Sequence, residues 1–83
     1  MPPIKYLANL TQTAEIGKKI YDERYRAQYE PAYNGKFLAI DLDTGVAALG
    51  ETSSDAMAAG KQAVPGGFFY LIRVGFPAAF VHH

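Results

Sequence analysis

Hydrophobic residues at helical spacing mark the first third of the chain. Ile16 and Ile20 lie one turn apart, and tyrosines continue the same side of the helix. Thr11 or Thr13 can cap the start. Pro31 stops the helix, because the residue before a proline avoids the helical backbone conformation. The spacing therefore predicts a long helix from about Thr13 to about Glu30.

Alternation with a period of two predicts a β-hairpin after this helix. From Lys36 to Leu42, Leu38 and Ile40 face one way, while Phe37 and Ala39 face the other. A tight turn at residues 43–45 is followed by a second, alanine-rich strand over residues 46–49.

A second helix and a third strand complete the pattern. Thr52, Ser53 and Ser54 are candidate caps for a short helix from about Ser54 to Ala63. Residues 68–74 are apolar on both faces except at Arg73, which favours a strand covered on both sides. Residues 78–81 are a candidate short terminal strand.

This element order predicts a small α+β fold with a long N-terminal helix, a β-hairpin, a short helix and a third strand. We expect a small antiparallel-type sheet with helices on one face. Residues 1–12 are expected to form an N-terminal arm, and residues 13–81 a single α+β domain. An uncovered sheet face bearing Phe37, Phe69 and Leu71 would favour a homodimer.

Two segments resemble a known group of proteins. They are Gly35-Lys36-Phe37-Leu38-Ala39-Ile40-Asp41 followed by Thr44-Gly45, and the later stretch from Arg73 to Ala79. They resemble short uncharacterised bacterial proteins with a "KGKFLAIDxxTG" hairpin and a "RIGxPA" ending. Members of this group are often encoded beside a small retropepsin-like aspartic protease, in an arrangement similar to toxin–antitoxin pairs. The resemblance implies a small cytoplasmic protein with a protein partner, and it transfers no catalytic residue.

The composition excludes several kinds of chemistry and binding site. The 83 residues include no cysteine, which excludes disulfides, thiolate catalysis and cysteine-ligated metals. Eight basic and eight acidic residues cancel, which argues against a nucleic-acid binder that relies on overall positive charge. The apolar runs are shorter than the roughly 20 residues of a membrane span, and the start does not read as a signal peptide. We therefore expect a cytoplasmic protein without membrane association, metal or cofactor.

Asp43-Thr44-Gly45 matches the triplet of aspartic proteases, which bring two such aspartates together around a shared water. The same three residues are common in tight turns, and we favour the structural turn. Asp41, two positions earlier, could share a face with Asp43 as a carboxylate site. Asp41 could instead form a structural ion pair with Arg73 across the sheet.

Tyr21, Tyr25 and Tyr29 recur every four residues, with Arg24 and Arg26 among them. Packing against the sheet is the first interpretation, since the rings can cover its edge. A protein interface is the second, because tyrosine and arginine are enriched at such contacts. Stacking on single-stranded nucleic acid is the least favoured.

The leading functional prediction is a small non-enzymatic protein-interaction protein, plausibly an antitoxin-like or accessory subunit. Its partner would be a second copy or a neighbouring gene product. The alternatives are a minimal carboxylate enzyme using Asp43 and, more weakly, a single-stranded nucleic-acid binder. The candidate interface residues are Tyr21, Arg24, Tyr25, Tyr29, Arg73, Phe76 and Phe80.

Overall fold

A computed structural model of the chain describes residues 10–76 and 79–82. The elements are helix α2 (Leu10–Ile20), a π-helical segment η1 (Tyr21–Tyr25), helix α3 (Arg26–Tyr29), strands β1 (Phe37–Asp41) and β2 (Ala47–Gly50), helix α4 (Ser53–Ala63), and strands β3 (Phe69–Arg73) and β4 (Ala79–His82). The predicted α+β class is confirmed. Residues 1–9, which make up most of the predicted arm, lie outside the described residues.

The four strands form one antiparallel sheet in the order β2-β1-β3-β4. The hairpin is confirmed. Strand β3 pairs with β1 on one side and with β4 on the other, and its two faces are covered, as predicted. The candidate terminal strand is present as β4.

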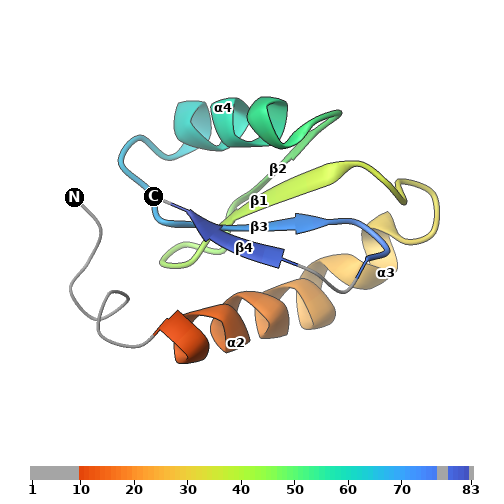
Figure 1. Ribbon diagram of the computed structural model, residues 1–83, viewed down its shortest axis with the longest axis horizontal. Coiled ribbons are helices and arrows are strands. Elements are labelled where there is room, and N and C mark those ends of the chain that lie inside the picture. Colours follow the sequence, from red (N-terminus) through yellow and green to blue (C-terminus); the bar gives the residue numbers. More distant parts are fainter. Residues whose placement is uncertain (1–9, 77–78, 83) are drawn as a thin grey trace.

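The expectation that both helices lie on one face is wrong, because α2 and α4 cover opposite faces of the sheet (Figure 1). Leu38, Ile40 and Tyr70 belong to the core under α2. Phe69 and Leu71 belong to a second core under α4. The face predicted to be uncovered is therefore buried, and it gives no reason to dimerise.

The first helix starts earlier than predicted and is not uniform. It begins at Leu10, so Thr13 is an interior residue and not its cap. Its backbone widens to a π-helical turn over Tyr21–Tyr25, where the amide of Arg26 donates to the carbonyl of Tyr21, five residues back. The stop before Pro31 is confirmed, since Glu30 is extended at φ −95° and ψ 143°.

Helix α4 follows its predicted signals. The Thr52 side chain accepts a hydrogen bond from the Asp55 amide at 3.1 Å, which caps the first turn. Ala56 and Gly60 are buried on the face toward the sheet. These small residues let the helix lie close to the strands.

Candidate functional site

The turn between β1 and β2 is closed by a buried carboxylate. Asp41 is 1% exposed and accepts hydrogen bonds from the Thr44 amide at 2.9 Å, the Thr44 hydroxyl at 2.7 Å and the Phe68 amide at 3.2 Å. Gly45 has a φ of 77°, a value that glycine adopts at little cost. Asp43, Thr44 and Gly45 thus lie in the connection between β1 and β2, and Asp41 holds this turn through Thr44.

Asp41 and Asp43 do not form the carboxylate pair considered from the sequence. Asp41 is buried and holds the turn, whereas Asp43 is exposed. The expected ion pair between Asp41 and Arg73 is also wrong. In the β1–β3 register Asp41 lies opposite Phe69 and Arg73 lies opposite Phe37, so the two charges are at opposite ends of the strand pair.

The π-helical segment contacts this turn. The Tyr25 hydroxyl donates to the carbonyl of Gly45. The Arg24 guanidinium lies so close to Gly45 that a β-carbon there would come within 2.2 Å of it. An open hollow of about 310 Å³ lies beside the contact, lined in part by Lys19, Arg24 and Asp43. The structure thus brings Arg24 and Tyr25 of the first helix into contact with Gly45 of the turn, about twenty positions later in the sequence.

Tyr21, one of the interface candidates, is a core residue with an exposed fraction of only 1%. Its hydroxyl donates to Glu30 Oε2 at 2.5 Å and also receives a hydrogen bond from the Gly75 backbone. Burial raises the pKa of the Tyr21 hydroxyl well above its ordinary value, and the Glu30 carboxylate acts in the same direction. The Gly75 hydrogen bond and Arg26 oppose this shift. The ring therefore offers no surface to a partner.

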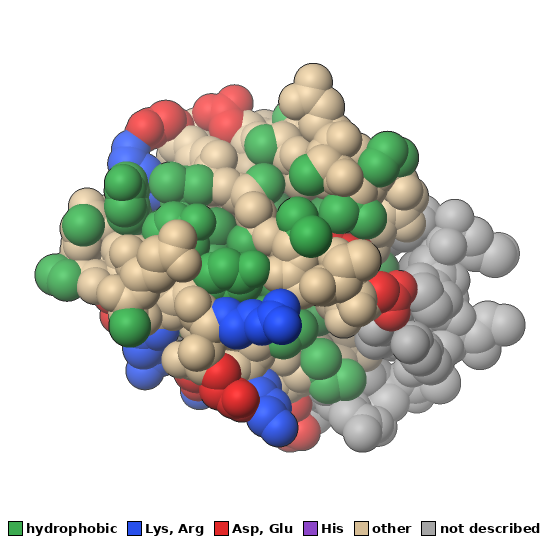
Figure 2. Space-filling model, turned by 180° about the vertical axis from the view of Figure 1, so that it is seen from behind, with side chains coloured by type: hydrophobic (Ala, Val, Ile, Leu, Met, Phe, Trp, Pro, Cys, Tyr) green, Lys and Arg blue, Asp and Glu red, His purple; other side chains and the backbone are tan. Residues whose placement is uncertain are grey.

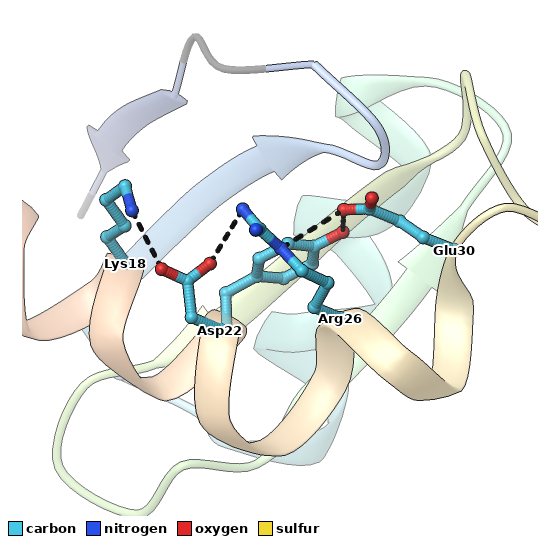
Figure 3. A network of polar contacts seen from close by, with 5 residues as sticks. Lys18, Asp22, Arg26 and Glu30 are labelled. Carbon is cyan, nitrogen blue, oxygen red and sulfur yellow. Dashed lines mark hydrogen bonds and ion pairs between the residues drawn. The ribbon is translucent and has the colours of Figure 1, made fainter.

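A ladder of alternating charges runs along the outside of the first helix (Figure 3). Lys18 pairs with Asp22 at 2.7 Å, and Asp22 pairs with Arg26 at 2.9 Å. Arg26 continues the ladder to Glu30 at 3.7 Å. Because Arg26 is shared between two carboxylates, this side of the helix is not the bare basic surface that nucleic-acid binding requires.

Aromatic side chains gather at the end of the molecule where α3 and the turn after β3 meet. The rings of Tyr25 and Tyr29 are 6.0 Å apart, and those of Tyr29 and Tyr33 are 5.6 Å apart. Figure 2 shows hydrophobic side chains at this end and across the middle of the same face. Tyr33 is 40% exposed and Phe76 is 45% exposed. We call this end of the molecule the aromatic end; its members are Tyr29, Tyr33, Phe37, Arg73 and Phe76. Tyr29 packs against the core under α2, and Phe37 packs against the core under α4.

A tight turn places Phe76 over Arg73. The Phe76 amide donates to the Arg73 carbonyl at 3.0 Å, and Gly75 between them has a φ of 84°. The Arg73 guanidinium then lies 4.4 Å from the Phe76 ring centre and 5.7 Å from that of Phe37. Contacts at such distances are favourable cation–π interactions.

The loop before β1 completes this surface. The Gly35 amide donates to the Val74 carbonyl at 2.9 Å, and the Gly35 carbonyl accepts from Arg73 Nε at 3.2 Å. Asn34 lies against Gly75 from the same loop. These contacts bring Tyr33 and Phe76 to one end of the molecule although 43 positions separate them in the sequence.

Of the predicted interface residues, Tyr29, Arg73 and Phe76 come together at this end. Arg24 and Tyr25 contact the hairpin turn, and the side chain of Phe80 lies outside the described residues. Sequence reasoning missed Tyr33, and it placed Phe37 on an uncovered sheet face without its contact to Arg73. Tyr33 continues the four-residue tyrosine spacing, but Pro31 indicates that the helix ends before it, so the spacing was not extended to Tyr33.

Comparison of the chain with protein-family models, curated protein sequences and solved structures found no match. The resemblance to short bacterial proteins therefore stays a prediction. Within the described part of the chain, no helix is long and apolar enough to cross a bilayer. The same residues contain no group of three or more histidine, aspartate or glutamate side chains placed to hold a metal ion.

Proposed function

We propose that this protein is a small non-enzymatic interaction domain and that its aromatic end is the contact surface. It would act as an accessory or antitoxin-like subunit of a cytoplasmic complex. One observation carries the proposal: exposed Tyr33 and Phe76 share one end with Arg73. Aromatic residues and arginine are the types enriched at the centres of protein interfaces.

The rigidity of this end also supports the proposal. Arg73 is held by the Gly35 carbonyl and two rings, and Phe76 is held by its turn. Side chains that are already ordered lose less conformational entropy on binding, so more of the contact energy remains as affinity.

A carboxylate enzyme built on Asp43 has less support. An aspartic-protease centre needs two carboxylates sharing a proton, about 3 Å apart. In this chain Asp41 already accepts three hydrogen bonds in the turn. Asp41 is therefore not available to share a proton with Asp43.

The test is purification of the tagged protein from the organism that encodes it, with stoichiometry read by native mass spectrometry. We expect a stable complex that the double variant Tyr33→Ala/Phe76→Ala no longer forms. The matched control is Val46→Ala, which removes an exposed apolar side chain of similar exposure, 43%, near the β1–β2 turn. The control should keep the complex.

Two results would overturn the proposal. A complex that survives the double variant would place the contact elsewhere on the protein. A chain that stays monomeric and bound to nothing under all conditions would remove the interaction function itself. Circular dichroism of each variant separates loss of contact from loss of fold.

A further inference from the structure

The Arg73 guanidinium is fixed in one orientation. Its Nε donates to the Gly35 carbonyl at 3.2 Å, and the aromatic rings of Phe37 and Phe76 lie within 5.7 Å and 4.4 Å of its central carbon. The bond at Nε leaves the two terminal nitrogens of the guanidinium without an acceptor among the described residues. Those nitrogens can bind a carboxylate through two parallel hydrogen bonds.

Arg73 also differs from most of the other cations in the way its charge is balanced. Lys18, Lys19, Arg26 and Lys36 each pair with a carboxylate of the same chain. Arg73 has no carboxylate within ion-pair distance among residues 10–76 and 79–82. The aromatic end therefore carries a positive charge that no carboxylate of the described residues balances, next to the exposed ring of Phe76.

We propose that the aromatic end binds an acidic segment of a partner protein. A carboxylate of that segment pairs with Arg73, and an adjacent apolar or aromatic side chain lies against Phe76 and Tyr33. The inference rests on the proposed function and adds the chemistry of the partner. Arginine suits this role because its planar group can stack on a ring and bind a carboxylate at the same time.

Charge distinguishes this occupant from a nucleic acid. Binding to a phosphate backbone draws its affinity from several cations that each release a counterion. Lys36, the basic residue one position before Phe37, is already paired with Glu51. Arg73 lies beside apolar rings and has no carboxylate partner among the described residues. This arrangement matches one carboxylate with a hydrophobic neighbour better than it matches a chain of phosphates.

The first experiment uses two capped nine-residue peptides, each with a central phenylalanine, flanked by glutamates in one and by lysines in the other. Binding is followed by titration of the full-length ¹⁵N-labelled protein. We expect the acidic peptide to shift amide signals of residues 33–37 and 73–76. The lysine peptide should leave them unchanged.

Substitutions then test the assigned contact. Arg73→Gln should weaken binding of the acidic peptide about tenfold or more, while Arg73→Lys, which keeps the charge but loses the planar group, should weaken it less. Arg24→Gln is the control, since Arg24 is an exposed arginine beside the β1–β2 turn. It should bind like the wild type.

Four results would overturn the inference. They are equal binding of both peptides, no binding of the acidic peptide, binding that Arg73→Gln does not change, and preferential binding of a twelve-residue thymidine oligonucleotide. Concentration-dependent shifts of the same signals without peptide would instead identify a second copy as the occupant.

Purification of the cellular complex with each variant distinguishes failure of this inference from failure of the proposed function. If Tyr33→Ala/Phe76→Ala dissolves the complex but Arg73→Gln leaves it intact, the interaction function stands and the acidic partner is wrong. If neither variant affects the complex, both are wrong.

Discussion

The two ends of the β1–β3 strand pair satisfy their charged residues in opposite ways. At one end, Asp41 is buried and accepts two hydrogen bonds from Thr44 in the neighbouring turn. It accepts a third from the amide of Phe68, the residue before β3. At the other, Arg73 is exposed, makes one hydrogen bond to the backbone and otherwise touches rings. At the first end, the hydrogen bonds of the Asp41 carboxylate fix the turn between β1 and β2. At the second end, the Arg73 side chain is exposed and has no carboxylate partner among the described residues.

The largest effect on stability should come from Asp41→Asn. An amide at this position turns one of the two acceptor oxygens into a donor, which must face either the Thr44 amide or the Phe68 amide. Buried donors left without acceptors cost about 1–3 kcal/mol each, so we expect a loss of about 3 kcal/mol or more. Urea unfolding followed by circular dichroism measures it.

The control for Asp41→Asn is Glu23→Gln. Glu23 is an exposed carboxylate whose pairing distance to Lys19 is 3.9 Å. Exposed pairs of this kind contribute about 0.5 kcal/mol or less. Equal losses of unfolding free energy for the two variants would contradict the view that the Asp41 hydrogen bonds stabilise this turn.

The next effect should come from Gly75→Ala, which tests how the aromatic end is built. A left-handed backbone costs a side-chain-bearing residue about 1–2 kcal/mol, and the new β-carbon would lie 2.6 Å from Asn34. We expect a loss of about 2 kcal/mol together with weaker partner binding, because Phe76 would move. Thermal unfolding and the peptide titration measure the two effects.

Gly66→Ala is a matched control for Gly75→Ala. Gly66 has a similar φ of 76°, but a β-carbon there would meet no atom within 4 Å. It should cost only the backbone term of about 1–2 kcal/mol and leave partner binding unchanged. If Gly66→Ala is the more damaging of the two, the Asn34 contact does not shape the aromatic end.

A smaller loss should follow Tyr21→Phe, which removes the hydrogen bond that ties the first helix to Glu30. We expect about 1 kcal/mol at neutral pH. Because burial raises the pKa of Tyr21 in the folded protein, the unfolded chain loses this proton first, and folding stability falls as the pH rises above about 10.

The Tyr21→Phe variant separates the contribution of Tyr21 to this pH dependence from those of Tyr29 and Tyr70. Burial also raises the pKa values of Tyr29 and Tyr70, so the wild type should lose stability at alkaline pH through all three groups. Tyr21→Phe should make that decline shallower between pH 9 and 11 without abolishing it. An unchanged slope would show that the Tyr21 hydroxyl does not resist ionisation in the fold.

The smallest effect on stability should come from Phe76→Ala. The ring is nearly half exposed, and its contact with Arg73 is worth about 0.5–1 kcal/mol at such a site. Partner binding should nevertheless fall strongly. A variant that loses more stability than Asp41→Asn would mean that the aromatic end belongs to the core.

Local sequence was sufficient for the elements themselves. The alternation of Leu38 and Ile40 with Ala39 predicted β1 and its two faces, and Thr52 predicted the start of α4. The turn at Asp43-Thr44-Gly45 was equally predictable, since turn chemistry depends on adjacent residues. Candidate residues Arg73 and Phe76 were found because they fall in one short segment.

Tertiary structure alone decided which face each helix covers, which charge met which partner, and which tyrosines stayed accessible. Spacing placed Tyr21 and Tyr29 on one helix side, but the π-helical turn and the packing of α2 buried the first and left the second near the surface. The strand register separated Asp41 from Arg73. Hydrophobic pattern specifies that a residue is covered, whereas the covering element depends on contacts between residues distant in sequence. For this reason the helices and strands could be predicted from the sequence, whereas the aromatic end could be recognised only in the folded chain.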